Sequence, residues 1–133
     1  MKTFKMGGVH PPENKFSAGK KTKIISLPQQ VIIPLRHYSG NPSVAEVSRG
    51  EIVKVGQLIG RANGFISANV HSSVSGKVSK IDNAMDAFGY KFPAVFIDVI
   101  GDDWLDEVDL SPEVKRVCNL EPHEIIKKVA EAG

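Results

Sequence analysis

Histidine is the residue type in this 133-residue sequence that offers the widest range of chemistry. His10, His37 and His71 could each bind a metal or relay a proton, because imidazole is a common metal ligand that titrates near neutral pH. No two of them have the close spacing of a metal motif. His10 precedes Pro11, which favours an extended backbone, and we expect it to anchor its segment by a hydrogen bond. We expect His71, which lies among serines, to be structural.

Two other constellations could carry chemistry. A hydrolytic triad on Ser75 is disfavoured, because the pattern Gly-x-Ser-x-Gly that exposes a nucleophile is absent. An acidic cluster could bind a cation or a basic partner, but it lacks the glycine and final glutamate of a calcium loop, so we interpret it as a linker. We expect Trp104 and Leu105, inside the cluster, to pack it against the core. The cluster consists of Asp102, Asp103, Asp106, Glu107 and Asp109.

Redox cofactors also need ligands that this sequence does not supply. Cys118 is the single cysteine, which excludes an internal disulfide and any zinc or iron-sulfur site built from several thiolates of this chain. No Gly-x-Gly-x-x-Gly follows a predicted strand and opens a helix. We therefore predict that this chain alone binds no flavin, nicotinamide nucleotide or iron and is not catalytic by itself.

Composition places these residues in one globular domain. Hydrophobic residues make up 41% and charged residues 24%, which are ordinary values. No apolar run approaches the roughly 20 residues of a membrane span. The net charge of +2 hides a gradient, because six lysines face one glutamate in residues 1–23, whereas ten acidic residues face four basic ones in residues 98–133. The basic end could attract an anionic membrane or a neighbouring subunit, and it has too few aromatic residues to favour nucleic acid.

The elements that must position these residues are mainly short strands. Runs rich in β-branched residues alternate with turn residues, and their close spacing predicts a compact all-β sandwich or barrel. The expected strands are residues 23–27, 31–35, 45–47, 52–55, 58–59, 65–70, 76–81 and 94–100.

The last part of the chain predicts two short helices. Ser111-Pro112 places a capping hydroxyl before a proline, and Glu121-Pro122 begins a second candidate. The second helix would carry an apolar stripe that needs a partner surface. That stripe consists of Ile125, Ile126, Val129 and Ala130.

Two glycine-rich segments carry the most informative spacing. Gly50–Ile59 has glycines on both sides of a short strand, and Gly76–Ile81 begins a later strand. Glycine suits turns that need a positive φ. Together the segments resemble the biotinyl/lipoyl-type barrel-sandwich hybrid.

Carrier domains of that type present one lysine on a hairpin between the two segments. The same count back from Gly76 leads to Phe65, and no lysine lies between Lys54 and Lys77. Asn63-Gly64 still predicts the hairpin turn. The resemblance therefore implies a retained scaffold without the carrier chemistry.

A second resemblance covers nearly the whole chain. The segments 4–15, 27–28, 31–40, 50–59 and 67–76, in that order, closely resemble the N-terminal domain of RnfC, a subunit of the Rnf electron-transport complex. The run Gly-Gly-Val-His-Pro-Pro-Glu at residues 7–13 is its most specific part. The family-motif residues are Gly7, Gly8, His10, Pro11, Pro12, Glu13, Pro34, His37, Gly40, Gly50, Gly56, Gln57, His71, Ser75 and Gly76.

This resemblance implies a parent complex that translocates ions and passes electrons between ferredoxin and nicotinamide nucleotide. RnfC would lie peripherally on the cytoplasmic side of the cell membrane. Its FMN, NADH and iron-sulfur sites would belong to other domains of the parent subunit. The implied partners are the other Rnf subunits and those downstream domains.

We therefore expect three parts. Residues 1–23 would form an arm, residues 24–101 a barrel-sandwich hybrid domain, and residues 102–133 an acidic linker with two short helices leading towards an absent flavin and NADH domain. The arm residues Gly7, Gly8, His10, Pro11 and Pro12 should be ordered against the barrel, because proline reduces the entropy lost on folding. The predicted function is docking and scaffolding. The alternative is a stand-alone biotinyl/lipoyl-like carrier or a protein-interaction domain.

Overall fold

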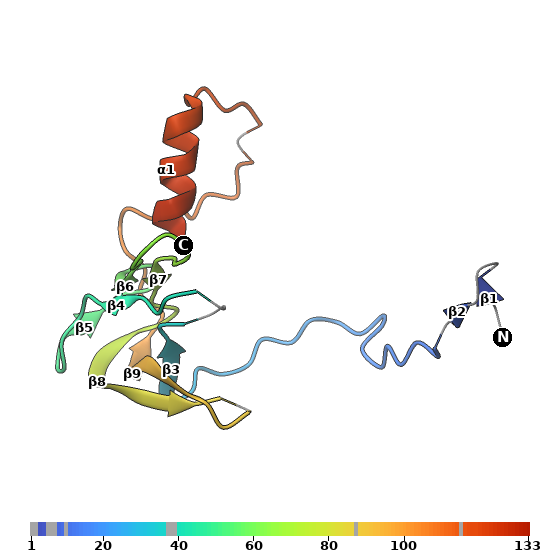
Figure 1. Cartoon of the computed structure of the whole chain (residues 1–133), viewed down its shortest axis with the longest axis horizontal. Coiled ribbons are helices and arrows are strands. Elements are labelled where there is room, and N and C mark those ends of the chain that lie inside the picture. The colour runs from blue at the N-terminus through green and yellow to red at the C-terminus, as the bar shows by residue number, and fades with distance from the viewer. Residues whose placement is uncertain (1–2, 5–7, 10, 37–39, 87, 115) are drawn as a thin grey trace.

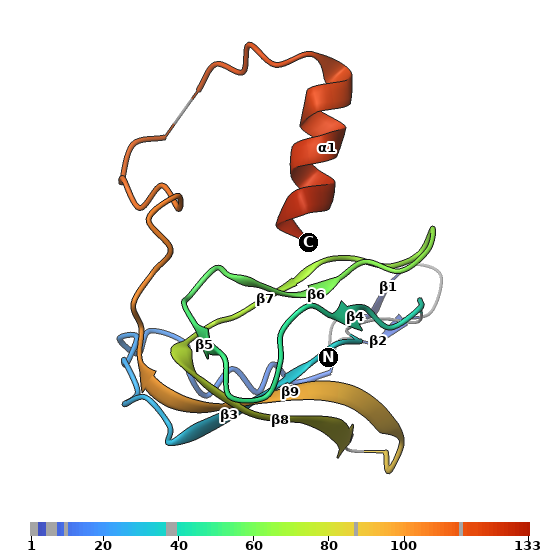
Figure 2. The same cartoon turned by 90° about the vertical axis from the view of Figure 1, so that its left-hand side faces the viewer.

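Two curled antiparallel sheets form the body of the molecule. The computed structural model describes residues 3–4, 8–9, 11–36, 40–86, 88–114 and 116–133. Figure 2 shows the two sheets one above the other, with the long strands in the lower layer. Within the described residues the fold is mainly β with a single helix, which agrees with the predicted class.

The larger sheet has the strand order β3-β9-β8-β5. Its strands are β3 (Gln30–Pro34), β9 (Lys91–Gly101), β8 (Ser75–Met85) and β5 (Ile52–Val53). β8 and β9 pair along their whole length, from Ser75 opposite Gly101 to Met85 opposite Lys91. β9 lies in the interior of the sheet, and residues 94–97 are buried without interruption.

The smaller sheet has the order β4-β6-β7. Its strands are β4 (Val44–Ala45), β6 (Leu58–Arg61) and β7 (Val70–His71). β6 and β7 form an antiparallel hairpin with a bulge between Leu58 and Gly60. The expected strand 65–70 is wrong except at Val70, because the chain between β6 and β7 is an eight-residue loop.

Aliphatic side chains from both sheets form one core. The buried polar side chains are satisfied: the Ser43 hydroxyl donates to the Ala68 carbonyl at 2.6 Å and the Ser72 hydroxyl to the Val74 carbonyl at 2.7 Å. Buried hydroxyls therefore hold loops onto the core without loss of hydrogen bonds. The core consists of Ile33, Leu35, Val47, Val53, Ile59, Val70, Val74, Val78, Val95 and Ile97.

The N-terminal segment does not join this core. Residues 11–30 are all exposed, and Figure 1 shows them leading away from the barrel. The expected strand at 23–27 is wrong. A tight reversal onto β3 would place Pro28 first in the turn, where primed turns need a positive φ that proline cannot adopt.

The expected packing of the arm against the barrel is also wrong for the residues that can be placed. Pro11 and Pro12 are exposed, and Gly8 belongs to β2 (Gly8–Val9), which pairs with β1 (Thr3–Phe4). Gly7 and His10 lie outside the described residues.

The acidic segment after β9 is tied to the barrel through its backbone. Val55 donates to the Asp103 carbonyl at 2.8 Å, and Leu105 donates to the Val55 carbonyl at 3.0 Å. The Asp103 N–H donates to the buried Ser75 hydroxyl at 3.0 Å. The segment is thus attached where expected, but through its backbone, because the Trp104 side chain is 44% exposed and is not part of the core.

One of the two expected helices is present. α1 (Pro122–Ala132) begins as predicted, with the Glu121 N–H donating to the Glu124 carboxylate at 2.9 Å. The helix expected from Ser111 is wrong, because none of residues 111–114 and 116–120 is helical. There the Ser111 N–H donates to the Asp109 carboxylate at 3.0 Å, a local alternative to a helical turn.

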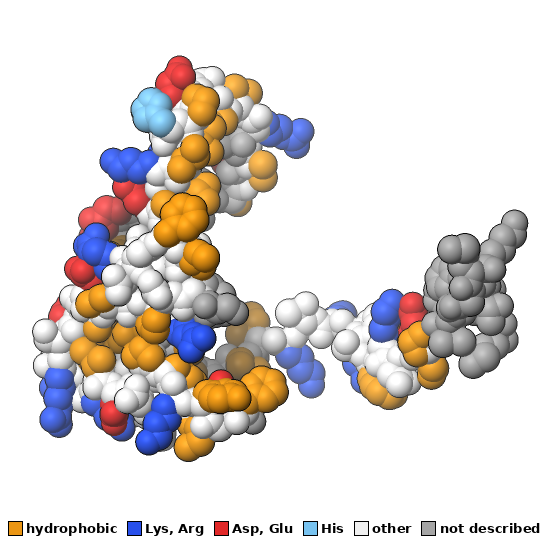
Figure 3. Space-filling model, in the orientation of Figure 1, with side chains coloured by type: hydrophobic (Ala, Val, Ile, Leu, Met, Phe, Trp, Pro, Cys, Tyr) orange, Lys and Arg blue, Asp and Glu red, His pale blue; other side chains and the backbone are white. Residues whose placement is uncertain are grey.

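α1 buries none of its residues. Ile125, Ile126 and Val129 are 41%, 71% and 66% exposed. Figure 3 shows hydrophobic side chains gathered over the visible face of this helix. The apolar stripe predicted from the sequence is thus present and uncovered.

β3 forms one edge of the larger sheet. The Leu35 N–H donates to the Pro93 carbonyl, and the Val99 N–H donates to the Gln29 carbonyl. The backbone N–H and C=O groups of the odd-numbered residues of β3 therefore point towards β9. The backbone groups of Gln30, Ile32 and Pro34 therefore point away from the sheet. Pro34 supplies a carbonyl but no N–H to this edge.

Candidate docking site

The β6–β7 hairpin corresponds in position to the hairpin on which carrier domains of the resembling type present their lysine. Its loop, residues 62–69, is held by its own side chains. The Ala62 N–H donates to the Asn69 carboxamide oxygen at 3.0 Å, and the Asn63 N–H donates to the Ser67 hydroxyl at 2.9 Å. Gly64 has a φ of 100°, a turn conformation that favours glycine. The predicted turn at Asn63-Gly64 lies in this longer loop.

A second loop clamps the hairpin from outside. The Asn41 N–H donates to the Ile66 carbonyl at 2.9 Å, and the Ser67 hydroxyl donates to the Asn41 carbonyl at 3.1 Å. A Cβ on Gly40 would lie 2.1 Å from the Ile66 carbonyl oxygen. Gly40, predicted from the family motif, therefore allows the two backbones to approach this closely.

This clamped loop presents apolar side chains to solvent. Phe65 is fully exposed and Ile66 is 64% exposed. An exposed aromatic on a backbone held by four hydrogen bonds differs from a side chain on a free loop, because little conformational entropy remains to be lost on binding. The tip can therefore act as a preformed contact point.

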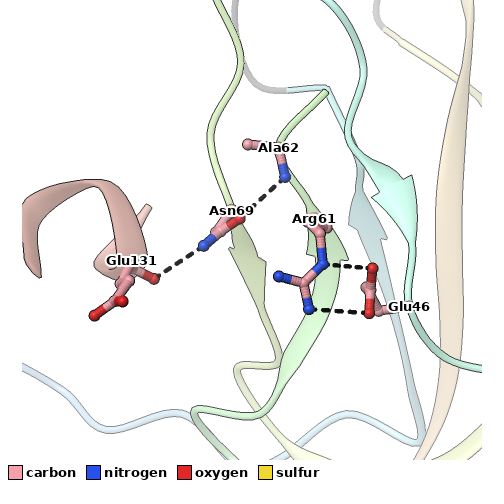
Figure 4. Close-up of polar contacts among 5 residues, drawn as sticks. All are labelled: Glu46, Arg61, Ala62, Asn69 and Glu131. Atoms are coloured by element: carbon pink, nitrogen blue, oxygen red, sulfur yellow. Dashed lines mark hydrogen bonds and ion pairs between the residues drawn. The ribbon is translucent and has the colours of Figure 1, made fainter. Parts of the chain in front are cut away.

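The end of α1 rests on the same hairpin. Figure 4 shows Asn69 between the two elements, with its carboxamide nitrogen donating to the Glu131 carbonyl at 3.2 Å and its oxygen accepting from Ala62. Gly133 packs so closely that a Cβ there would lie 2.4 Å from the Asn69 carbonyl oxygen. One side chain thus joins the hairpin to the helix.

An open groove of about 600 Å³ lies beside this contact. It runs between β3 and β7, with the end of α1 at one side. Its lining is mostly apolar and includes Pro34 and His71 from the predicted set. The lining residues are Ile32, Ile33, Pro34, Ala68, Asn69, Val70, His71, Ser73, Ala132 and Gly133.

A bidentate ion pair braces the base of the hairpin. Arg61 Nε and Glu46 Oε1 are 2.6 Å apart, and a second bond joins Arg61 Nη2 to Glu46 Oε2 at 3.2 Å. The hydrogen bond from Arg61 lowers the pKa of the Glu46 carboxyl below 4.5, and the same bond raises the pKa of Arg61. The pair links β6 to residue 46, which directly follows β4.

The predicted chemical residues that the structure describes do not form a metal site. Within the described ranges, no three His, Cys, Asp or Glu side chains lie together as metal ligands would. His10 and His37 lie outside those ranges, His71 is half-buried beside the groove, and Cys118 is exposed and single. These side chains do not fit an iron-sulfur cluster, which needs several thiolates.

The remaining motif residues build turns or close contacts. Gly50 and Gly56 have φ values of 91° and 84°, as their predicted turns require. The Gln57 side chain accepts from the Lys54 N–H at 3.0 Å and so closes the turn before β6. A Cβ on Gly76 would lie 2.2 Å from the Asp98 carbonyl oxygen. Pro11, Pro12 and Glu13 are exposed on the arm.

Sequence reasoning missed Asn41, Ser67 and Asn69, which organise the hairpin. Asn and Ser side chains commonly bond to nearby backbone in turns. The density of such residues around Asn63-Gly64 was the available signal. Their pairing across 26 residues, between Ser67 and Asn41, depends on the tertiary fold.

Comparison with known protein families identifies a match for most of this chain. Residues 2–102 match the family described as the RnfC barrel sandwich hybrid domain. The mainly β architecture agrees with that description. No helix among the described residues combines the length and apolar character that a membrane crossing needs.

Three relatives have names that agree with the family match. Over 100% of its length, this chain is 38% identical to the C subunit of the proton-translocating ferredoxin:NAD(+) oxidoreductase complex of Clostridium ljungdahlii, covering 29% of that protein. It is 40% identical over 98% of its length to the C subunit of the Na(+)-translocating ferredoxin:NAD(+) oxidoreductase complex of Acetobacterium woodii, again covering 29%. The C subunit of the ion-translocating oxidoreductase complex of Rhodobacter capsulatus is 33% identical over 96% of this chain, which covers 24% of that relative. The chain therefore spans under a third of these proteins.

Proposed function

This chain belongs to the family of RnfC barrel sandwich hybrid domains, and we propose that it is a docking and scaffolding domain within the RnfC subunit of an ion-translocating ferredoxin:NAD oxidoreductase complex. In this role it holds neighbouring protein surfaces in place and carries no electrons itself. Its partners are the other subunits of the complex and further domains of its own subunit. Its place is peripheral, on the cytoplasmic side of the membrane.

One observation carries this proposal. Where carrier domains present a lysine, the hairpin presents the fully exposed Phe65 on a clamped loop. A swinging carrier needs an amine for attachment, whereas a docking surface needs an aromatic anchor that enters a pocket of the partner. The hairpin is retained, but a phenylalanine stands in place of the carrier lysine. This replacement favours docking over the carrier alternative.

The uncovered stripe of α1 supports the same function. The helix is tied to the hairpin at its C-terminal end by the bond from Asn69 to Glu131, while its apolar face stays open. An amphipathic helix with an open face is a common protein contact. The hairpin tip and the helix face together offer two contact points joined by one side chain.

Cofactor chemistry would lie elsewhere in the parent subunit under this proposal. FMN, NADH and iron-sulfur clusters would bind the further domains, since this chain has one cysteine and lacks a dinucleotide motif. A purified sample should be colourless, and titration with FMN or NADH should give no saturable heat. Stoichiometric flavin binding would move catalysis into this domain and contradict a purely scaffolding role.

The docking role is tested by Phe65→Ser in the full-length subunit, expressed in cells in place of the natural one. The amount of complex that assembles on the membrane is measured on native gels. Loss of a central aromatic anchor should weaken assembly by roughly thirtyfold in affinity. The matched control is Phe88→Ser, which removes an aromatic side chain that is 85% exposed on the other hairpin.

Equal assembly of the Phe65→Ser and wild-type subunits would contradict docking through this tip. The carrier alternative has its own readout. Incubation of the chain with a biotin or lipoate ligase should leave its mass unchanged. A single stoichiometric adduct would establish a carrier instead.

A further inference from the structure

The lysine-rich part of the arm, residues 15–25, has a charge environment unlike the rest of the chain. Between Glu13 and Glu46 there is no acidic residue, while five basic residues occur there. Within the described residues, Lys54 and Lys80 of the barrel lie near Asp106 and Asp82, at 3.7 and 3.2 Å. No acidic side chain in the described part of the chain pairs with Lys20, Lys21 or Lys23. Lys15 pairs with Glu13 at 2.9 Å, so the uncompensated positive charge of this segment lies at Lys20, Lys21 and Lys23.

Apolar side chains lie at both ends of the lysine run. Phe16 is 81% exposed, and Ile24 and Ile25 are 99% and 85% exposed. Phe16 lies in a turn at residues 15–20, which is closed by bonds from the Ala18 N–H to the Lys15 carbonyl and from the Lys20 N–H to the Ser17 carbonyl, both at 3.1 Å. Figure 3 shows basic and apolar side chains together along this part of the arm.

We propose that residues 15–25 bind the surface of an anionic lipid bilayer. Lysines attract the negative lipid headgroups, and the isoleucines and Phe16 enter the headgroup boundary beside them. This rests on the proposed function and deepens it, because an ion-translocating complex lies in a membrane and a domain at its periphery would have the lipid surface within reach.

A lipid surface suits this segment better than an acidic protein does. An acidic protein surface would pair with the lysines and leave Phe16, Ile24 and Ile25 in water, whereas a lipid interface takes up both the charged and the apolar side chains. Long lysine side chains can also lie along the apolar boundary while their ammonium groups stay in water.

The short connection between the arm and the barrel means that lipid binding by the arm would also fix how far the barrel lies from the membrane. Gln29 accepts from Val99 at 2.9 Å, and β3 begins at the next residue. Only residues 26–28 separate the bound segment from this attachment. Lipid binding would therefore hold the barrel within about 10 to 14 Å of chain from the membrane surface.

The test measures binding of the 133-residue chain to sedimented vesicles of phosphatidylcholine, with and without phosphatidylglycerol. Binding should require the anionic lipid. The triple substitution Lys20→Gln, Lys21→Gln and Lys23→Gln should weaken it by roughly a hundredfold, at about fivefold for each lysine. The control triple, Lys77→Gln, Lys91→Gln and Lys128→Gln, changes the net charge equally at exposed sites elsewhere.

A second pair of variants tests the apolar contribution. Ile24→Ser with Ile25→Ser should remove the binding that survives when salt rises from about 0.1 M to about 1 M, which shortens the screening length from about 10 Å to about 3 Å. Ile100→Ser with Val117→Ser is the control, because these side chains are 70% and 77% exposed and lie outside the arm. All four residues are exposed, so the unfolding midpoint should stay the same.

Three results would overturn the proposal: no binding to anionic vesicles, equal loss with the two lysine triples, or equal binding to neutral vesicles. Cross-links from the arm to another protein of the complex, with vesicle binding unaffected by the arm triple, would assign the arm to a protein partner and also overturn it. The vesicle assay contains no other protein. Its failure therefore leaves the Phe65 assembly experiment unaffected, and the reverse holds as well.

Discussion

The barrel and its two flanks use the same residue types for opposite purposes. The ten aliphatic side chains that form the core lie between residues 33 and 97 and are buried, whereas Ile24, Ile25 and Ile126 in the flanks are largely exposed. Burial of apolar area provides most of the stability of a small domain. Stability should therefore depend on the barrel, and the exposed apolar and charged residues of the flanks are left for contact with other surfaces.

The largest effect should come from matched isoleucine substitutions. Ile97→Ala removes a fully buried side chain in β9 and should lower the free energy of unfolding by between about 2 and 5 kcal/mol, through lost transfer energy and a cavity. Ile24→Ala in the arm should change it by less than about 0.5 kcal/mol. Urea unfolding followed by circular dichroism measures both. Similar losses in the two variants would contradict the division between barrel and arm.

Glycine substitutions sharpen the same comparison. Gly76→Ala forces a Cβ to within 2.2 Å of the Asp98 carbonyl oxygen, so β8 and β9 must shift apart. We expect a cost of about 1 to 3 kcal/mol. Gly19→Ala, where no atom lies within 4 Å of the added Cβ, strains only a local turn in the arm. Its thermal midpoint should match that of the wild type, and a shared loss would show that the arm folds with the barrel.

The sequence predicted those parts of the fold whose cause is local. Gly50 and Gly56 could be assigned to turns because glycine favours the positive φ that both residues have in the structure. The start of α1 could be located from Glu121-Pro122. The family motif also indicated Gly40, whose reason is tertiary: the backbone of Ile66 lies against it. The barrel type came from the resemblance of the two glycine-rich segments to barrel-sandwich hybrids.

The failures arose where local propensity had no tertiary support. Residues 23–27 have strand composition, but Pro28 prevents a tight return onto β3, and the segment remains exposed. Residues 111–118 would form about two helical turns with no surface to cover, and so short an isolated helix is marginal. The hairpin clamp through Asn41 joins distant parts of the sequence, which no local pattern reveals.

A smaller effect is expected where the acidic segment meets the barrel. Ser75→Ala removes the hydroxyl that accepts from the Asp103 N–H at 3.0 Å. A lost hydrogen bond at a buried side chain should cost about 1 kcal/mol and speed amide exchange at Asp103. Ser26→Ala, an exposed hydroxyl in the arm, is the control. Unchanged exchange at Asp103 would show that the two backbone bonds to Val55 are sufficient to hold the acidic segment on the barrel.

The smallest effect should be present at neutral pH and lost in acid. The folded-state pKa of Glu46 is lowered by its bond from Arg61, so the pair stabilises the fold above the ordinary glutamate pKa of 4.5. That contribution is lost as pH falls through the lowered pKa. The difference in urea midpoint between wild type and Glu46→Gln should therefore be present at neutral pH and disappear below the lowered value. A difference that persists in strong acid would assign the effect to packing.

Pro34 has a consequence for the behaviour of the protein at high concentration. The outward-facing edge of β3 offers backbone groups at Gln30 and Ile32, but the next outward residue lacks an N–H. A strand from another molecule could therefore pair over a very short stretch before it met a position without a donor. We therefore expect Pro34 to limit the growth of fibrils from this edge of the sheet.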